Sequence, residues 1–148
     1  MEFYVTDGED YLDEIIAFDK LVSYNFLKFP IPFDEYSERY EKLIRELLSR
    51  GEHKFFVALG KNGKFLGHVW LCMTLDTVDY VKIAYIYDIE VKQKGEGIGS
   101  ALLKRAEEFA KEKGAKKVVL RVDLSNPALE WYKRKGYTER AVIVEKEI

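Results

Sequence analysis

The sequence has little of several features that point to particular classes of protein. Cys72 is the only cysteine in 148 residues, which excludes an internal disulfide and a cysteine-rich zinc or redox cluster. No apolar run approaches the ~20 residues of a membrane span, and Met1 is followed by Glu2 instead of a basic, apolar signal segment. The net charge is only −2, which argues against a strongly basic surface. We therefore expect a cytoplasmic protein with a small soluble partner, without nucleic acid or membrane.

What is present is enough for a single domain over residues 1–148, because 47% of the residues are hydrophobic. Residues 3–5 read as a short opening strand, and apolar positions at helical spacing between Leu12 and Val22 predict a helix behind it. Residues 26–33 contain two prolines and form an aromatic-rich connection. A second helix carries apolar residues from Tyr36 to Leu48 and ends at Gly51.

The rest of the chain alternates strands and helices. Strands are predicted at 53–59 and 65–74, joined by a hairpin in which Asn62-Gly63 supplies positive φ angles. A strand at 81–91 precedes a glycine loop and a helix that ends at Gly114. A strand at 117–122, a helix capped by Asn126 and a final strand around Val142 and Val144 complete an α/β domain around a mixed sheet.

The glycine loop has the residue types of an anion site. Gly95, Gly97 and Gly99 follow a strand and precede a helix, so backbone N–H groups can converge on a phosphate beside the positive end of the helix dipole. No lysine follows the last glycine, which disfavours a P-loop, and the spacing also disfavours a dinucleotide fingerprint. A turn that only joins strand to helix stays an equal alternative on the glycines alone.

The residues around the loop decide between these alternatives. Residues 88–103 (DIEVKQKGEGIGSALL) resemble the central acetyl-CoA motif of the GNAT superfamily of N-acetyltransferases. Residues 119–122 (VLRV), 125–128 (SNPA) and 131–137 (WYKRKGY) resemble the next strand and helix of that superfamily, while the first half of the chain agrees in element order. The resemblance implies a GNAT-like fold, a central mixed twisted sheet with about four helices, with acetyl-CoA as cofactor. It also allows a homodimer.

The resemblance carries a set of cofactor contacts onto this chain. The pantetheine arm would lie between the strands ending at Val91 and Val122 and bond the backbone of Ile89 and Val91. Lys94 occupies a position where the family has glutamine or arginine, so it keeps a positive charge but lacks a planar fork, and Gln93 could partly substitute for it. The expected contacts are Ile89, Glu90, Val91, Gln93, Lys94, Gly95, Glu96, Gly97, Ile98, Gly99, Ser100, Asn126 and Tyr132.

The catalytic acid is better specified than the base. Tyr132 matches the family's tyrosine that faces the thioester sulfur as general acid, although without the resemblance it reads as a core aromatic residue. Some relatives carry a histidine or glutamate where this chain has Tyr87 and Tyr85. The ordinary pKa of tyrosine, about 10, suits it poorly for removing an ammonium proton, so these two residues are expected to order a water molecule.

The acceptor is expected to meet acidic and aromatic side chains. Asp88 resembles the acid that guides cationic acceptors in polyamine-type members, with a structural hydrogen bond as the alternative. Glu90 has an exposed strand end as its alternative. The predicted acceptor-binding residues are Phe26, Phe29, Phe33, Tyr85 and Asp88, and the alternative for the three phenylalanines is core packing.

No metal site is expected, because His53 and His68 lack metal-ligand spacing and are interpreted as structural. Cys72 has no activating neighbour in the sequence. We predict direct transfer of acetyl from acetyl-CoA to a primary amine in a ternary complex, the amine being a small molecule or a protein N-terminus or lysine. A non-catalytic acyl-CoA-binding sensor or regulatory module is the alternative. Only a short segment follows Gly136-Tyr137, which predicts an open acceptor side.

Overall fold

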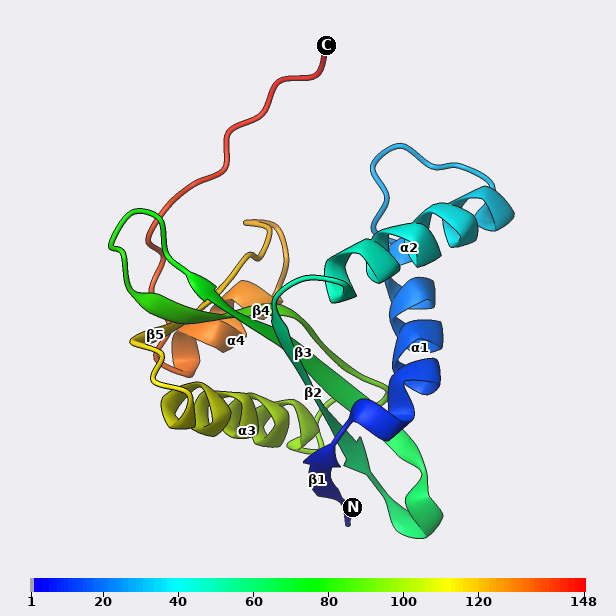
Figure 1. The fold of residues 1–148 in the computed structure, drawn as a ribbon. Coiled ribbons are helices and arrows are strands. Elements are labelled where there is room, and N and C mark those ends of the chain that lie inside the picture. The colour runs from blue at the N-terminus through cyan, green and yellow to red at the C-terminus, as the bar shows by residue number, and fades with distance from the viewer. Residues whose placement is uncertain (1) are drawn as a thin grey trace.

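A five-stranded sheet forms the centre of the molecule in the computed structural model, which describes residues 2–148 (Figure 1). The strands lie in chain order, the first four antiparallel to their neighbours and the last parallel to β4. Their bounds are Tyr4–Asp7 (β1), Glu52–Leu59 (β2), Phe65–Leu75 (β3), Lys82–Val91 (β4) and Lys117–Leu120 (β5). The predicted mixed sheet is therefore present.

Four α-helices cover the two faces of this sheet. Two of them, α1 (Leu12–Tyr24) and α2 (Phe33–Leu48), lie on one face, and α3 (Ile98–Glu112) and α4 (Ala128–Arg134) lie on the other (Figure 1). Short 3₁₀ turns at Glu9–Tyr11 (η1) and Lys61–Gly63 (η2) lead into α1 and join β2 to β3. The predicted α/β fold class agrees with this arrangement.

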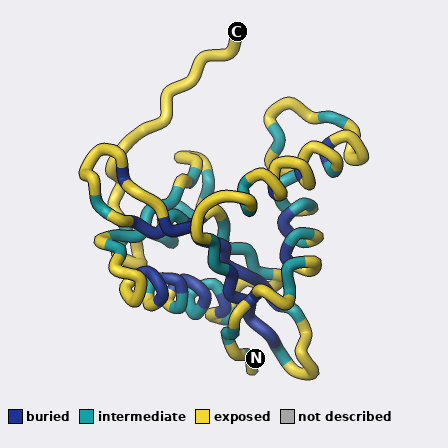
Figure 2. The backbone as a smooth tube through the Cα atoms, viewed as in Figure 1, coloured by how far each residue is buried: buried dark blue, intermediate teal, exposed yellow. Residues whose placement is uncertain are grey.

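Two apolar clusters hold the layers together, one on each face of the sheet (Figure 2). On the α3 face, Leu102, Leu103 and Ala106 of the helix are 2% exposed or less and pack against β2, β3 and β4. On the other face, Ile15 of α1 and Tyr36 and Tyr40 of α2 pack against the opposite side of β2 and β3. Alternation along each strand places its residues on one cluster or the other.

The turn residues behave as the sequence predicts. Asn62 and Gly63 in the β2–β3 hairpin have φ angles of 61° and 72°, and Gly114 ends α3 at 82°. Glycine avoids the clash that a side chain meets in this left-handed region. The antiparallel hairpin predicted between residues 53–59 and 65–74 is therefore confirmed.

The prediction of a final strand around Val142 and Val144 is wrong. Residues 138–148, which we call the tail, form no helix or strand and extend away from the body (Figure 1). The side chains of Val142 and Val144 are 75% and 87% exposed. A strand needs a neighbouring backbone with which to exchange hydrogen bonds, and residues 138–148 exchange none with the rest of the described chain. The preceding strand, predicted to reach Val122, ends at Leu120.

Candidate functional site

The β4 strand contains a bulge where its pairing with β5 stops. Trp70 pairs with Asp88 and Leu71 pairs with Ile86, so Tyr87 is an extra residue in β4. The parallel pairing with β5 ends at Ile86 and Leu120, and residues 87–91 have no strand on that side. A bulge bends a strand and redirects its side chains. The split leaves backbone groups of β4, including those of Ile89 and Val91, beside an opening between the two strands.

The glycine loop lies directly after this split. Gly95 and Gly97 have φ angles of 85° and 77°, and a methyl group added to either would meet no heavy atom within 4 Å. The loop is therefore both left-handed and open to solvent. It leads into the fifteen-residue α3, and no side chain within the described chain caps the first turn of that helix. The N-terminal N–H groups and the helix dipole favour an anion at this position.

The side chains predicted to touch the cofactor differ in how they are held. Gln93 Nε2 lies 3.4 Å from Glu96 Oε1 at the surface, and Lys94 is exposed. Ile98 is buried in the core at 1% exposure, so only its backbone can face a ligand. Gly99 lies under Trp131, whose ring is 3.6 Å from the place of a Cβ atom. A cofactor at these positions would therefore meet backbone more than side chains.

Asn126 and Tyr132 belong to the α4 end of the opening. The Asn126 Oδ1 atom accepts a hydrogen bond from the Ala128 N–H at 2.9 Å, which is the bond of a helix cap. Tyr132 packs against the α3-side cluster beside Trp131 and Tyr137. Burial, with a smaller contribution from the charge of Asp88, raises the pKa of Tyr132 to about 12. Its hydroxyl therefore keeps its proton at neutral pH and is a donor.

A buried polar cluster lies on the opposite side of β4, under α1. His68 of β3 is fully buried, and its Nε2 lies 2.6 Å from Asp88 Oδ1 and 3.4 Å from Glu90 Oε1. Asp19 of α1 is close enough to both carboxyl groups for its charge to raise the pKa of each. Ser23 Oγ and the Tyr40 hydroxyl donate to Asp19. We call His68, Asp88, Glu90 and Asp19 the acid cluster.

The acid cluster must share protons because three carboxyl groups lie together in a dry environment. Burial raises the pKa of Asp88, and His68 opposes that rise. Burial and the charges of Asp88 and Asp19 raise the pKa of Glu90 to about 10. No cation lowers the pKa of Glu90, so Asp88 is the better placed of the two β4 carboxyls to ionise. The exposed strand end considered for Glu90 is wrong, since its side chain is only 12% exposed.

The acid cluster could also be considered as a cation site. The ligand atoms of His68, Asp88 and Glu90 lie within 4.8 Å of one another. However, the 2.6 Å between His68 Nε2 and Asp88 Oδ1 is a hydrogen-bond distance, whereas two ligands on one zinc ion are roughly 3.3 Å apart in tetrahedral geometry. The geometry favours a hydrogen-bonded acid cluster over a metal site.

An aromatic wall continues from the cluster along the same face. Tyr87 is 38% exposed and stacks on Trp70 at 4.2 Å between ring centroids, and Tyr85 meets Tyr87 edge to face at 5.1 Å. Trp70 Nε1 donates to His53 Nδ1 at 3.0 Å, while His53 Nε2 reaches two carbonyl oxygens at the end of α2 at 2.7 Å. His53 therefore joins α2 to the sheet.

Cys72 shares this face but is not activated. Its side chain is 8% exposed, and burial raises the pKa of its thiol. Its Sγ atom is 3.9 Å from His53 Nε2, a nitrogen already directed at two carbonyl oxygens. A thiolate nucleophile needs a depressed pKa and a free base, so this cysteine is not suited to covalent catalysis.

The aromatic residues between α1 and α2 differ in exposure. Phe26 and Phe29 are 74% and 69% exposed, which overturns the core-packing alternative for these two residues. Phe33 is 38% exposed and packs edge to face on Tyr24 at 5.1 Å, so it belongs partly to the α1–α2 packing. Two large exposed aromatics on one loop are available to a ligand.

Sequence reasoning missed His68, which it assigned to a purely structural role. His68 and Asp88 are twenty positions apart, and they meet because residue 68 pairs with residue 90 across β3 and β4. Strand alternation could have placed His68 on the same face as Trp70. The bulge at Tyr87 sets which β4 residues oppose it, and the sequence does not reveal a bulge.

The fold and site together define a class: an α/β protein with a split between parallel strands, a glycine loop at a helix start and acidic residues on the other side of the bulged strand. Residues 18–137 match the model of the acetyltransferase (GNAT) family. The chain therefore belongs to the acetyltransferase (GNAT) family. No helix in residues 2–148 is long and apolar enough to cross a membrane.

Individual relatives agree with this assignment. An uncharacterized N-acetyltransferase of Methanocaldococcus jannaschii is 37% identical over 119 residues, covering 75% of this chain and 52% of the relative, so this chain spans about half of that protein's length. An uncharacterized N-acetyltransferase of Bacillus subtilis is 26% identical over 119 residues, covering 78% of this chain and 74% of the relative.

A solved structure resembles the whole of this chain. A Pyrococcus furiosus protein, described only provisionally as an acetyl transferase, is 61% identical and has a TM-score of 0.97, covering 99% of this chain and all of the other. The tail is eleven of 148 residues, and a TM-score of 0.97 could not be reached if those residues took a different course. The tail therefore extends in the same way in that protein.

Proposed function

We propose that this protein transfers the acetyl group of acetyl-CoA to a primary amine, by direct attack of the amine within a ternary complex. The observation that carries the proposal is the split after Ile86 and Leu120, which places the open backbone of β4 between the glycine loop, Tyr132 and the acid cluster. The glycine loop would bind the pyrophosphate, and the split would admit the pantetheine arm. The cofactor supplies an activated thioester.

Two proton transfers are required of the chain itself. An amine that arrives as an ammonium ion must lose a proton before it can attack, and the departing thiolate must gain one. Asp88 is suited to the first transfer because its raised pKa brings it closer to that of the amine and because His68 helps to hold its charged form. Tyr132 is suited to the second transfer because its hydroxyl stays protonated.

The acceptor side favours a cationic substrate. Asp88 and Glu90 lie on the face covered by α1 and α2, next to the aromatic wall of Tyr87 and Trp70. Carboxylates attract an ammonium group, and aromatic faces add cation–π attraction. Phe26 and Phe29 would form an exposed rim over this entrance, which would leave room for either a small amine or the end of a peptide.

A screen of amines with acetyl-CoA, read by mass spectrometry, tests the proposal. The panel contains polyamines, amino sugars, peptides with free N-termini and lysine-containing peptides. A mass increase of one acetyl group on one class, with release of free CoA, is the expected result. If acetyl-CoA shifts the thermal unfolding midpoint but no amine in the panel is acetylated and no CoA is released, the protein is an acyl-CoA sensor and the proposal is wrong.

A further inference from the structure

The tail has the composition of a buried strand but no partner. Residues 141–144 (AVIV) form an uninterrupted apolar run with charged residues on both sides, which is typical of a strand covered on both faces. In the structure Val142, Ile143 and Val144 are 75%, 61% and 87% exposed. No backbone group of residues 138–148 bonds another backbone group within the described chain.

The sheet has an open edge of the matching kind. β5 is the last strand of the sheet and pairs only with β4 among the described residues, so its outer edge presents unpaired backbone groups. Exposed strand edges are sites at which another strand adds. The edge of β5 and the tail therefore both carry unpaired backbone groups that could bond to each other.

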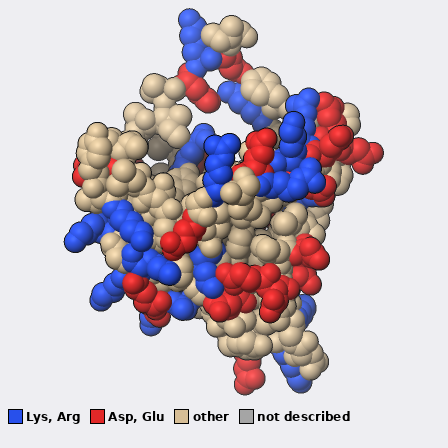
Figure 3. Space-filling view, in the orientation of Figure 1, with Lys and Arg blue, Asp and Glu red and all other residues tan. Residues whose placement is uncertain are grey.

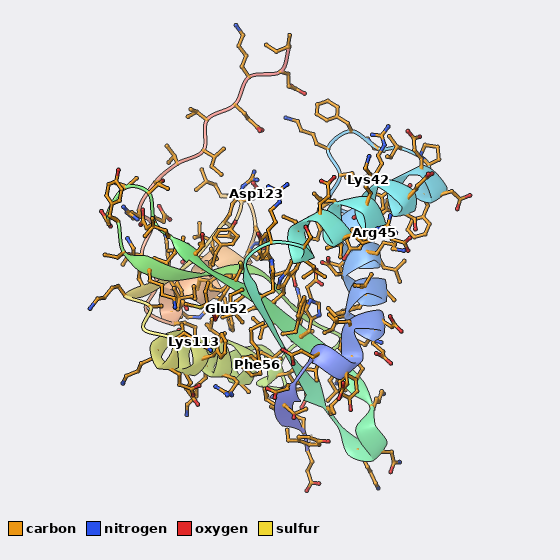
Figure 4. The ribbon with its side chains drawn as sticks, in the orientation of Figure 1. Lys42, Arg45, Glu52, Phe56, Lys113 and Asp123 are labelled. Carbon is orange, nitrogen blue, oxygen red and sulfur yellow. The ribbon has the colours of Figure 1, made fainter. Side chains whose placement is uncertain are left out.

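A cavity of about 1290 Å³ separates the tail from β5, which is larger than a typical small-molecule pocket of roughly 300–1,000 Å³. Figure 3 shows an opening between the tail and the body, and Asp123 in Figure 4 marks the loop after β5. Four cavity-lining residues are also among the most exposed large apolar residues: Val78, Leu124, Val142 and Ile143. Such a concentration of exposed apolar side chains is typical of a protein interface.

Ion pairs attach the tail to its own chain at two places, one near the start of β5 and one near the α1–α2 connection. Arg140 is 2.7 Å from Asp76 and 3.0 Å from Asp79, carboxylates that also pair with Lys117. Near the other end, Glu145 and Glu147 lie 3.8 and 3.7 Å from Lys28 of the α1–α2 connection. Between these attachments the apolar run crosses open space. The related Pyrococcus furiosus structure, with a TM-score of 0.97, shares this course.

We propose that two copies of this chain exchange tails, so that residues 141–144 of one copy form a strand beside β5 of the other. One two-fold axis would satisfy both copies, because each offers the same tail and the same edge. The partner's tail would fill the cavity and cover its four exposed apolar residues. Tyr85 and Tyr132 line the same cavity, so the partner would also complete one wall of the site. This last consequence rests on the proposed function, whereas the exchange does not.

The solution mass tests the exchange without any assay of activity. At about 100 µM the chain should have about twice its mass of 17.3 kDa by light scattering. Replacing both Val142 and Val144 with lysine should halve the mass, since lysine would bury a charge in the new sheet. Both side chains are already exposed in the isolated chain, so a monomer would tolerate the change. Leu21→Lys, at a 58% exposed position on α1, is the matched control and should stay dimeric.

Hydrogen exchange measured on the unaltered chain identifies the interface. The amides of residues 141–144 should exchange at least about tenfold more slowly than in an unfolded peptide, and their protection should fall on dilution. A monomer at about 100 µM overturns the proposal. So does a dimer with an unprotected tail, which would use another surface, or a monomer with a protected tail, which would pair the tail with its own β5. Each of these results leaves the acetyl-transfer proposal unaffected.

Discussion

The two faces of the sheet differ in what they bury. On the α3 face the buried side chains are apolar, from Phe56 of β2 to Leu102 and Phe109 of the helix. On the α1–α2 face the apolar cluster adjoins Asp19 and His68, both buried, together with Asp88 and Glu90. The buried side-chain atoms that lack a hydrogen-bond partner among residues 2–148 are His68 Nδ1 and Glu90 Oε1, both on this second face.

This difference suggests that one face mainly stabilises the fold and the other carries the reactive groups. Burying apolar surface stabilises the fold, whereas burying a carboxyl group without full compensation costs free energy. The rest of the α1–α2 face is also packed with apolar side chains, so the acid cluster is a local exception. We infer that the α3 face fixes the glycine loop and the position of Tyr132, and that the opposite face is adapted to the proton and charge of the acceptor.

The largest expected effect is loss of cofactor binding at the end of the α3 face. CoA should raise the thermal unfolding midpoint of the protein, because a ligand that binds only the folded state stabilises it. Gly97→Glu should abolish that shift, since a carboxylate would fill the open loop and repel the pyrophosphate. The readout is the midpoint with and without CoA.

Gly114→Glu is the matched control for that change. Gly114 has a φ of 82° against 77° for Gly97, and both have open space around an added side chain. Each substitution should therefore cost about 1–2 kcal/mol from the left-handed backbone alone. Only Gly97→Glu should lose the CoA shift. An equal CoA shift in both variants would remove the glycine loop from the cofactor site.

The next effect is on turnover alone. Tyr132→Phe removes the hydroxyl proposed to protonate the thiolate and keeps the ring that packs on the α3-side cluster. Turnover should fall about 10²-fold or more while the CoA-induced shift stays the same. Tyr137→Phe is the control, because its hydroxyl donates to Glu107 at 2.8 Å, outside the split between β4 and β5. If both variants turn over equally at saturating substrate, Tyr132 is a packing residue.

The contrast between the two faces also explains which parts of the structure could be predicted from the sequence alone. The α3 face follows from local patterns: an apolar stripe at helical spacing, positive-φ glycines and a capping asparagine, all within one stretch of chain. The same stretch carried the family resemblance. The order and type of the helices and of the five strands could therefore be predicted, together with the cofactor loop.

The acid cluster and the tail could not be predicted because both depend on distant partners. His68 meets Asp88 through the β3–β4 register, and Asp19 comes from α1, which the sequence does not place over residue 88. The tail has the residue pattern of a strand, yet the pattern does not say whether a neighbouring backbone is within reach. The spacing of apolar residues in a sequence indicates which positions tend to be buried, but it does not identify the segment that covers them.

On the α1–α2 face, Asp88→Asn should weaken use of the acceptor and leave the CoA shift unchanged. The amide keeps the shape of the side chain but cannot hold an ammonium ion or take its proton. We expect the amine's KM to rise or kcat to fall by about tenfold or more. The pH profile adds a second readout: wild-type activity should rise with pH through the raised pKa of Asp88, and the variant should lose that limb. Wild-type kinetics with the true acceptor would make Asp88 structural.

The smallest expected effect is on stability, and it concerns the proton on Glu90. Its pKa is 4.5 as an ordinary carboxyl and about 10 in the folded protein, where burial and the charges of Asp88 and Asp19 oppose its ionisation. Between these values the unfolded chain releases the proton and the folded chain keeps it, so the free energy of unfolding should fall as pH rises from 4.5 towards 10. Below that window both states are protonated and the loss disappears.

Glu90→Gln removes this titration and keeps a neutral side chain of the same shape. At pH near 8 the variant should be more stable than the wild type by at least about 1 kcal/mol, and near pH 4 the two should be nearly equal. The measurement is urea unfolding of the CoA-free protein across that range. Glu108→Gln, an exposed position on α3, is the control and should show the wild-type pH dependence. If Glu90→Gln keeps the wild-type pH dependence, Glu90 is ionised in the folded state, and the contrast between the two faces would be smaller than the structure indicates.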